Sequence, residues 1–275
     1  MARPFSGEFA ARKDDACEPL KIGVNAPSRI CERVKGKGQV KALLIPVKDL
    51  RNAKQRLAPA LPQPQRTALA EAMFEDFCAS VAKIRCVDRI FVATNYEPAI
   101  ERARAFGWDV LRETSQESES ASVDAASRIC AGRGITSLAR LPIDLPLVIP
   151  SDIEEIFAVA PPAPSAVIVP SRSGTGTNAL LRTPPTLFSS FFGPNSFPKH
   201  RREAERCGAE LAVLRNERLE LDVDDWDDLQ VLASRPDLPS ATRGWLAGAG
   251  LLRQALAASA TAYSLHAYPG DALEE

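Results

Sequence analysis

The stretch that decides the fold is residues 41–94, KALLIPVKDLRNAKQRLAPALPQPQRTALAEAMFEDFCASVAKIRCVDRIFVAT. It begins with a short apolar run, 41–46, which has the length and composition of a buried strand. A basic, proline-containing loop follows over 47–64, and 64–84 then carries apolar residues at helical spacing. A second apolar run over 89–94 completes the pattern. Because neighbouring parallel strands need a helical crossover, this stretch predicts the start of a parallel sheet.

The same alternation continues along the chain. Further strands are expected over 108–111, 137–141, 166–169, 178–181 and 210–214, and helices over 98–105, 122–132, 151–158, 198–207 and 225–232. Strands that alternate with helices predict an α/β fold with a mostly parallel sheet and helices on both faces. In such sheets ligands bind beyond the carboxyl ends of the strands. The loops that follow the expected strands are therefore where functional residues are sought.

The chain of 275 residues divides into a central domain and two extensions. Residues 1–38 are polar and irregular, and this composition predicts an N-terminal extension that is disordered or lies before the true start of the protein. The compact pattern occupies 39–234, and 235–275 differ in composition and form a C-terminal extension. Within that extension, 245–257 could form a helix, although two glycines weaken it.

The composition excludes several classes of protein. A net charge of −1 provides no global attraction for nucleic acid or anionic lipid. No apolar run approaches the roughly 20 residues that cross a bilayer, and the N-terminus has no apolar signal core. We therefore expect a cytoplasmic protein with no nucleic-acid or membrane partner. The six cysteines form no Cys-x-x-Cys pair, which favours reduced thiols, at Cys17, Cys31, Cys78, Cys86, Cys130 and Cys207.

Acidic residues follow two of the expected strands. Asp144 stands between Pro142 and Pro146, which restrict the backbone around its carboxylate. Asp222 and Asp224 alternate in an extended segment, so that both side chains project to the same side. Two like charges held together are costly unless a cation lies between them. Oxygen ligands of this kind suit Mg²⁺, so Asp144, Asp222 and Asp224 are candidate metal ligands, with a turn or capping role as the alternative.

The acidic run continues beyond the candidate metal ligands. Asp225, Asp227 and Asp228 immediately precede or begin an expected helix. Acidic side chains are favoured at a helix N-terminus, where they interact with the positive end of the helix dipole. These three aspartates are therefore expected to begin a helix and not to bind the metal.

Glycine-rich and basic segments provide candidate phosphate ligands. Residues 173–177, Ser-Gly-Thr-Gly-Thr, allow a close approach of the backbone to an anion and supply hydroxyl donors. A flexible turn is the alternative for this segment, as it is for Gly193 and Ser196. Lys48, Lys54 and Arg56 lie just after the first expected strand and could neutralise a triphosphate and a departing pyrophosphate. A solvated basic loop is the alternative. His200 could donate a hydrogen bond to a ligand carboxylate or phosphate, or could be structural.

Two nucleotide-binding motifs are absent. The sequence has no Gly-x-x-x-x-Gly-Lys-Ser/Thr loop and no Gly-x-Gly-x-x-Gly after the first strand. These absences disfavour a Walker-type nucleotide hydrolase and a dinucleotide-dependent dehydrogenase. The acidic, glycine-rich and basic segments together indicate a magnesium-dependent enzyme that acts on a nucleoside triphosphate.

Five segments in a fixed order resemble the 2-phospho-L-lactate guanylyltransferase family, which includes phosphoenolpyruvate and 3-phospho-D-glycerate guanylyltransferases. The segments are 46–48 with 53–57, 144–147, 174–180, 192–200 and 221–224. The resemblance spans about residues 40–234 and leaves both extensions outside it. It implies a nucleotidyltransferase-like fold of the nucleotide-diphospho-sugar transferase type over 39–234.

The resemblance also implies an activity and a set of ligands. GTP and a small phosphorylated three-carbon acid would give a guanosine diphospho-linked acid and pyrophosphate, in the biosynthesis of the deazaflavin coenzyme F-420. Mg²⁺ would be held by Asp144, Asp222 and Asp224, and the phosphate of the acid by Thr177, Gly193 and Ser196, with Lys48, Lys54 and Arg56 near the triphosphate. A downstream biosynthetic transferase is a possible partner, and the oligomeric state stays open.

Three rival hypotheses share the same residues. One is a nucleotidyltransferase that uses CTP or UTP, and another is a non-catalytic nucleotide-binding protein of the same fold. The third is a metal-dependent glycosyltransferase, which would release a nucleoside diphosphate and not pyrophosphate. The identity of the phosphorylated acid and of the nucleobase cannot be decided from these segments.

Overall fold

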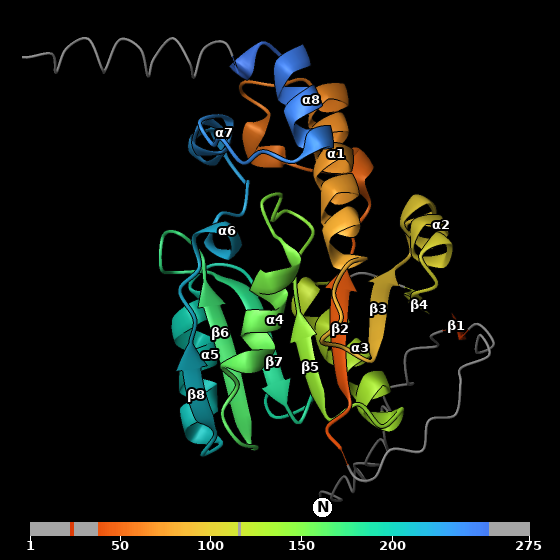
Figure 1. Cartoon of the computed structure of the whole chain (residues 1–275), viewed down its shortest axis with the longest axis vertical. Coiled ribbons are helices and arrows are strands. Elements are labelled where there is room, and N and C mark those ends of the chain that lie inside the picture. The colour runs from red at the N-terminus through yellow and green to blue at the C-terminus, as the bar shows by residue number, and fades with distance from the viewer. Residues whose placement is uncertain (1–22, 25–37, 115–116, 253–275) are drawn as a thin grey trace, which may run out of the picture.

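The computed structural model describes residues 23–24, 38–114 and 117–252. In these ranges one eight-stranded sheet forms the centre of the structure, in the order β1-β4-β3-β2-β5-β7-β6-β8 (Figure 1). The strands are β1 (Gly23–Val24), β2 (Lys41–Pro46), β3 (Arg89–Thr94), β4 (Asp109–Arg112), β5 (Ser137–Arg140), β6 (Ser165–Pro170), β7 (Thr177–Thr183) and β8 (Glu210–Val213).

Helices separate most of these strands, as the sequence predicts, and the last three of the described helices follow β8. The helices are α1 (Gln63–Val81), α2 (Glu97–Ala105), α3 (Glu119–Gly132), α4 (Pro150–Ala158), α5 (Ser196–Arg206), α6 (Glu217–Glu220), α7 (Trp226–Ala233) and α8 (Ser240–Gly248). Two short 3-10 turns, η1 (Leu50–Asn52) and η2 (Gln55–Leu57), shape the basic loop after β2. None of the described helices is both long and apolar enough to cross a membrane.

The sheet is mostly parallel, as predicted. The antiparallel strand β7, which lies between β5 and β6, helps to position the site. Strand β2 is parallel to β3 and β5, and β6 is parallel to β8. Strand β7 runs antiparallel between β5 and β6, with Arg140 opposite Leu180. Because β7 runs the other way, its first residues, Thr177 and Asn178, lie at the edge where β5 ends. Side chains from the start of β7 can therefore meet the loop that follows β5.

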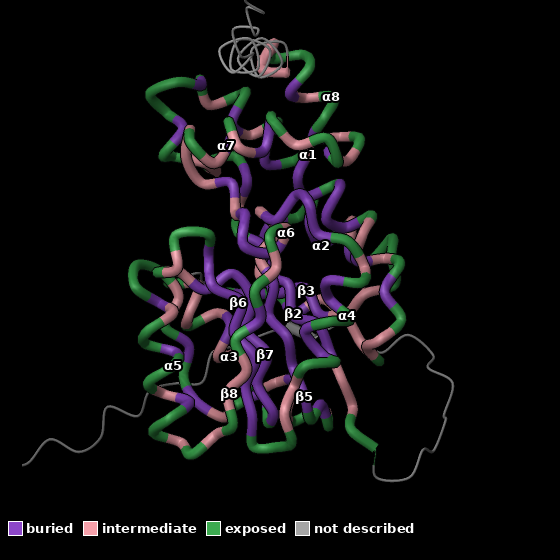
Figure 2. The backbone as a smooth tube through the Cα atoms, turned by 60° about the vertical axis from the view of Figure 1, so that its left-hand side comes forward, coloured by how far each residue is buried: buried purple, intermediate pink, exposed green. Residues whose placement is uncertain are grey.

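Both faces of the sheet are covered by helices. Leu43 and Ile45 of β2 belong to a core that includes residues of α1, α2 and α4. Leu44 points to the opposite face and packs with residues of α3, while Ile168 and Leu180 pack with α5 on that face. Buried residues follow one another along the strands, whereas exposed residues lie mainly in the outer loops (Figure 2). The alternation of these apolar side chains on each strand is what the two-sided packing of an α/β sheet requires.

A second hydrophobic cluster joins α1, α7 and α8 beyond the end of the sheet (Figure 1). It contains Leu69 and Met73 of α1 together with Leu232 and Leu246. The carboxylate of Asp76 on α1 accepts hydrogen bonds from the first amides of α8, those of residues 241 and 242. The part of the C-terminal extension that is described therefore packs on the central domain, and its helix begins at Ser240, earlier than predicted.

The two ends of the chain lie largely outside the described residues. Of the predicted N-terminal extension, the structure places the two residues of β1, which pair antiparallel with β4. The predicted helix 245–257 is interrupted in its described part, because α8 ends at Gly248 and a turn follows at residues 249–250; its positions after 252 are not described. The described cysteines are free thiols, at Cys78, Cys86, Cys130 and Cys207, whereas Cys17 and Cys31 are not described.

Candidate active site

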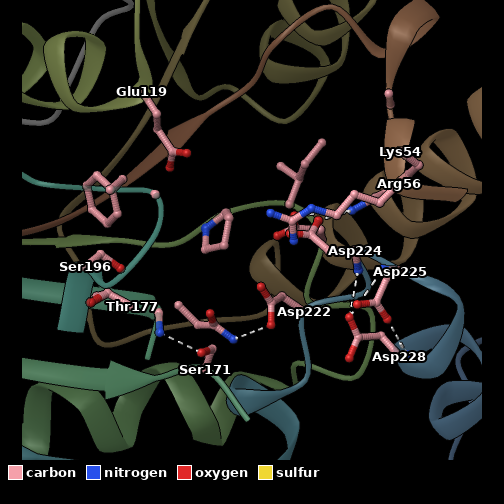
Figure 3. Close-up of a pocket in the computed structure, with 18 of the residues that line it drawn as sticks. Lys54, Arg56, Glu119, Ser171, Thr177, Ser196, Asp222, Asp224, Asp225 and Asp228 are labelled. Carbon is pink, nitrogen blue, oxygen red and sulfur yellow. Dashed lines mark hydrogen bonds and ion pairs between the residues drawn. The ribbon is translucent and has the colours of Figure 1, made fainter. Parts of the chain in front are cut away.

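A cavity of about 900 Å³ opens at the edge of the sheet where β2 and β5 end. Its walls come from the loop after β2, the loop after β5, the start of β7, the start of α5 and the segment before α7. Figure 3 shows acidic and basic side chains from these segments pointing toward one another. The cavity is therefore built from the segments in which the sequence predicted functional residues.

The three predicted metal ligands line this cavity together. Asp144 follows β5, and Asp222 and Asp224 lie in the extended segment between α6 and α7. The amide of Val223 donates a hydrogen bond of 3.1 Å to the main-chain oxygen of Asp144. Val223 is fully buried between the two other aspartates. This backbone contact holds the two acidic segments against each other, which the sequence pattern anticipated.

Two cations of the basic loop reach the aspartates. Lys54 Nζ lies 3.2 Å from Asp144 Oδ2 and 3.4 Å from Asp224 Oδ1. Arg56 Nη1 lies 3.4 Å from Asp224 Oδ2, with an exposed side chain. Lys54 has a φ of 55°, in the left-handed region that non-glycine residues rarely adopt. This backbone conformation places the ammonium group between two carboxylates, and such strain is often found at functional sites.

Charge at the site is unevenly distributed among the three aspartates. Burial, together with the negative charges of Asp144 and Asp224, raises the pKa of Asp222 to about 6. Burial and the charge of Asp144 also raise the pKa of Asp224. Burial would raise the pKa of Asp144 too, but the positive charges of Lys54 and Arg140 outweigh it and hold that pKa below its ordinary value. The site thus has an excess of negative charge that a further cation would relieve.

The residues present are suited to holding a divalent cation. Among the described residues, Asp144 Oδ1 is buried and has no hydrogen-bond partner. The surrounding donors are carboxylate oxygens, which hard cations such as Mg²⁺ prefer. No group of three or more His, Cys, Asp or Glu side chains in the described ranges is already gathered in metal-binding geometry. The ammonium of Lys54 lies where Asp144 and Asp224 face each other, so a cation that bound both carboxylates would have to displace it.

A second part of the cavity is rich in hydrogen-bond donors. Thr177, Gly193 and Ser196 all line it, at the start of β7 and at the N-terminus of α5. Gly193 has a φ of 112°, which only glycine adopts without strain. Ser196 is buried and is the first residue of α5, whose 11 residues direct their positive dipole end to this wall. Hydroxyl groups and a helix N-terminus together form a suitable site for a phosphate.

His200 lies behind this wall and not in it. Its side chain is fully buried, its Nδ1 lies 3.0 Å from Thr177 Oγ1, and its Nε2 accepts a hydrogen bond of 2.8 Å from the amide of Phe191. Both ring nitrogens are therefore engaged within the protein. The expected hydrogen bond from His200 to a ligand does not fit this placement, and the ring instead supports Thr177.

Other predicted residues take the positions that their sequence patterns suggested. Lys48 is exposed and lines the cavity at the start of the basic loop. Asp225 caps the N-terminus of α7 by accepting hydrogen bonds from the amides of Asp227 and Asp228. Asp228 also pairs with Arg172 at 2.8 Å. The prediction that Asp225 and Asp228 serve the helix start is confirmed by these bonds.

Sequence reasoning missed three polar residues of the cavity. Asn178 donates hydrogen bonds to Asp222 Oδ1 at 3.1 Å and to the carbonyl groups of residues 219 and 220, each at 3.0 Å. Arg140 lies on β5 and forms an ion pair with Glu119 at the start of α3. A charged residue at the end of a strand that is otherwise buried was the signal for Arg140, because an arginine there needs a partner.

Comparison with known proteins identifies the family to which the chain is similar. Residues 41–235 match the family described as "Guanylyl transferase CofC like". A phosphoenolpyruvate guanylyltransferase of Roseiflexus castenholzii is 35% identical over 200 residues, which cover 73% of this chain and 91% of that protein. A 2-phospho-L-lactate guanylyltransferase of Methanothermobacter thermautotrophicus is 33% identical over 186 residues, which cover 68% and 81%. A 3-phospho-D-glycerate guanylyltransferase of Colwellia psychrerythraea is 32% identical over 191 residues, covering 70% and 90%.

Solved structures share the fold at low sequence identity. A protein described as a nucleotide-diphospho-sugar transferase, from Desulfovibrio desulfuricans G20, superposes with a TM-score of 0.64 at 16% identity, covering 79% of this chain and 99% of that one. A nucleotidyl transferase from Methanothermobacter gives a TM-score of 0.51 at 16% identity, covering 70% and 95%. These likenesses confirm the predicted nucleotidyltransferase-like α/β fold. The chain belongs to the CofC-like family of guanylyl transferases.

Proposed function

We propose that this protein transfers GMP from GTP to the phosphate of a small phosphorylated three-carbon acid. An oxygen of the acid's phosphate attacks the α-phosphorus of GTP, and the bond between that phosphorus and the bridging oxygen of the β-phosphate breaks. The products are a guanosine diphospho-linked acid and pyrophosphate. The phosphate is already a nucleophile near neutral pH, so no general base is needed. The product would serve biosynthesis of the deazaflavin coenzyme F-420.

The observation that carries this proposal is the pairing of two different anion sites in one cavity. Asp222 and Asp224 lie with Lys54 and Arg56 in one part, and Thr177 and Ser196 lie in another (Figure 3). Asp144 belongs to the first part, because it pairs with Lys54. A reaction between two phosphate compounds needs such an arrangement, because both anions must be neutralised and aligned. The names of the similar proteins, which specify guanylyltransfer to three phosphorylated acids, support the same activity.

The residues would divide the work between the two substrates. Asp144, Asp222 and Asp224 would hold Mg²⁺, which when bound would supply charge neutralisation and alignment of the reacting phosphates. Lys54, freed from the carboxylates, and Arg56 would stabilise the negative charge on the departing pyrophosphate, with Lys48 nearby at the rim. Thr177, Gly193 and Ser196 would bind the phosphate of the acid and orient it toward the α-phosphorus.

One incubation series tests the proposal. The purified protein is mixed with Mg²⁺, one nucleotide (GTP, CTP or UTP) and one acid, either phosphoenolpyruvate, 2-phospho-L-lactate or 3-phospho-D-glycerate. The products are identified by mass spectrometry, and pyrophosphate is measured separately. GTP with one of these acids should give the guanosine diphospho-linked acid and pyrophosphate. If product forms with CTP or UTP but not with GTP, the choice of guanine as the base is wrong. GTP binding without any product would favour a non-catalytic nucleotide-binding protein.

A further inference from the structure

We propose that Arg140 binds the carboxylate of the acid substrate, and that Glu119 occupies the guanidinium group until the acid replaces it. This inference rests on the proposed function, because it assumes that the phosphate of the same acid lies against Thr177, Gly193 and Ser196. It assigns to the acid a second contact point, which neither the motif resemblance nor the basic loop supplies.

Arg140 is a buried cation with unused hydrogen-bonding capacity. It is 5% exposed and lines the cavity from the end of β5. Its Nη1 donates a hydrogen bond of 3.0 Å to the main-chain oxygen of Asn178, and its Nη2 pairs with Glu119. Within the described residues its Nε has no hydrogen-bond partner. Because a buried guanidinium is costly unless its donors are satisfied, this group is suited to receive a further acceptor.

The surroundings of Arg140 connect it to both elements of the phosphate site. The carbonyl that it contacts belongs to Asn178, the residue after Thr177, and its guanidinium stacks 4.1 Å from the ring centre of Phe192, the residue before Gly193. The cation therefore lies between the start of β7 and the turn that leads into α5. An acid whose phosphate contacts these two elements has its carboxylate only a few bonds away, within reach of Arg140.

The two ligands are assigned to opposite sides of the cavity, and the ion pair of Arg140 with Glu119 lies on the side of the acid. In Figure 3, Glu119 lies on the same side as Thr177 and Ser196, whereas Lys54 and Arg56 lie on the opposite side. Arg140 pairs with Glu119, so its guanidinium can be reached from the half of the cavity assigned to the acid, while its charge also acts on Asp144 and Asp222. The triphosphate has its own cations on the other side. The anion that best fits the position of Arg140 is thus the carboxylate of the acid.

Glu119 makes the exchange between ligand-free and bound states possible. It is the first residue of α3, and its side chain is 29% exposed, so its carboxylate can leave toward solvent. Replacing one carboxylate by another keeps the buried arginine paired throughout. Burial lowers the pKa of Arg140 to about 10, against the opposing effect of Asp144 and Asp222, so the guanidinium stays charged at neutral pH. Arg140 then recognises the carboxylate by charge-assisted hydrogen bonds in a planar geometry.

Paired substrates test this assignment directly. Equilibrium binding and, where turnover occurs, kcat/KM are measured for 3-phosphoglycerate and for glycerol 3-phosphate, which carries a hydroxymethyl group in place of the carboxylate. The wild-type protein should prefer the acid, and Arg140→Met should reduce that preference by about 10- to 100-fold, through a loss for the acid alone. Arg140→Lys, which keeps the charge, should lose less. Glu119→Gln should lower the KM for the acid and leave the KM for GTP unchanged.

The matched control is Arg182→Lys, compared with Arg140→Lys. Arg182 is also buried, pairs with Asp124 at 3.2 Å and stacks on a phenylalanine ring, but it is not among the residues that line the cavity. Its replacement should change thermal stability and leave the preference for the acid unchanged. The assignment is overturned if folded Arg140→Met, or Arg140→Lys where the first variant does not fold, keeps the wild-type preference.

The failure of the proposed function would be recognised separately. If no combination of nucleotide and acid gives pyrophosphate with the wild-type protein, guanylyltransfer is wrong. The binding comparison between 3-phosphoglycerate and glycerol 3-phosphate still decides the role of Arg140 in that case. Equal weakening of both compounds by Arg140→Met would show that this arginine contacts phosphate and not carboxylate, which contradicts the inference.

Discussion

The ring of His200 fixes the direction in which Thr177 can donate a hydrogen bond. Because the Phe191 amide can only donate, the Nε2 that accepts from it carries no hydrogen. Nδ1 must then carry the hydrogen and donate it to Thr177 Oγ1, 3.0 Å away. The hydroxyl hydrogen of Thr177 is left to point elsewhere, and Thr177 lines the cavity. His200 thus leaves the Thr177 hydroxyl free to donate a hydrogen bond to a group other than the imidazole.

The first prediction concerns this hydroxyl group. Thr177→Val keeps the size of the side chain but removes the donor, so we expect kcat/KM for the acid to fall by about 10- to 100-fold, as for a lost hydrogen bond to a charged group. Thr177→Ser should retain most of the activity. Steady-state kinetics with varied acid and saturating GTP measure the effect. Equal activity of the two variants, both shown to be folded, would rule out the hydroxyl as a ligand.

The second prediction concerns stability in acid. Burial and the positive charges of Arg182 and Arg140 lower the pKa of His200 to about 3, whereas an unfolded histidine titrates near 6.5. Between these values the imidazole binds more protons in the unfolded state, so the contribution of His200 to the free energy of unfolding decreases as the pH falls below about 6.5. The contribution of His200 to the free energy of unfolding is about 2 kcal/mol smaller at pH 5 than at pH 7.5.

Urea unfolding of the wild type and of His200→Asn at both pH values measures this contribution. The variant has no imidazole at this position, so it should lose about 2 kcal/mol less than the wild type between pH 7.5 and pH 5, although it is less stable at both. The same dependence on pH in both proteins would show that His200 is not the group responsible.

The third prediction concerns the junction of the two acidic segments. Asp144→Asn removes a charge that Lys54 and a bound cation would share, so turnover should fall by about 100-fold or more, as when one preorganised electrostatic group is lost. The main-chain oxygen that binds the Val223 amide is unchanged, so the fold should be retained. Pyrophosphate release and circular dichroism are measured on the same preparation. Near-normal turnover in the folded variant would refute a role for this carboxylate in the reaction.

The fourth prediction concerns the packing of α8 on α1. Leu246 is fully buried in the cluster that joins α1, α7 and α8. Leu246→Ala should reduce the free energy of unfolding by about 2–5 kcal/mol, because it removes buried contacts and leaves a cavity. The control, Ala247→Ser on the exposed side of the same helix, should change it by less than about 0.5 kcal/mol. If both variants match the wild type in urea unfolding, α8 does not contribute to the stability of the domain.

The fold and the acidic site were predictable because both follow from local patterns. Apolar runs such as β2, followed by the helical periodicity of α1, specify parallel crossovers without knowledge of distant contacts. Asp144 follows a predicted strand, and Asp222 and Asp224 alternate in an extended segment. The tendency of α/β sheets to bind ligands beyond the ends of their strands then predicts that the three carboxylates meet at one edge. The structure gathers these residues as predicted.

Other features depend on tertiary pairing and could not be read from short segments. The antiparallel insertion of β7 between β5 and β6 brings Asn178 to Asp222, and no local pattern specifies that strand order. The ion pair of Arg140 with Glu119 joins two elements that are separate in sequence. The orientation of His200 depends on the amide of Phe191, a loop residue, so its role behind Thr177 required the structure.

The central claim is that Asp144, Asp222 and Asp224 together hold a divalent cation against the phosphates of GTP. Binding of Mn²⁺, a paramagnetic substitute for Mg²⁺, is titrated by electron paramagnetic resonance with and without GTP, in the wild type and in Asp222→Asn. The control is Asp227→Asn, which changes an exposed carboxylate in the first turn of α7. We predict that GTP strengthens Mn²⁺ binding and that Asp222→Asn weakens it by about tenfold or more, while the control binds as the wild type does. Equal Mn²⁺ affinity in all three proteins would contradict the account.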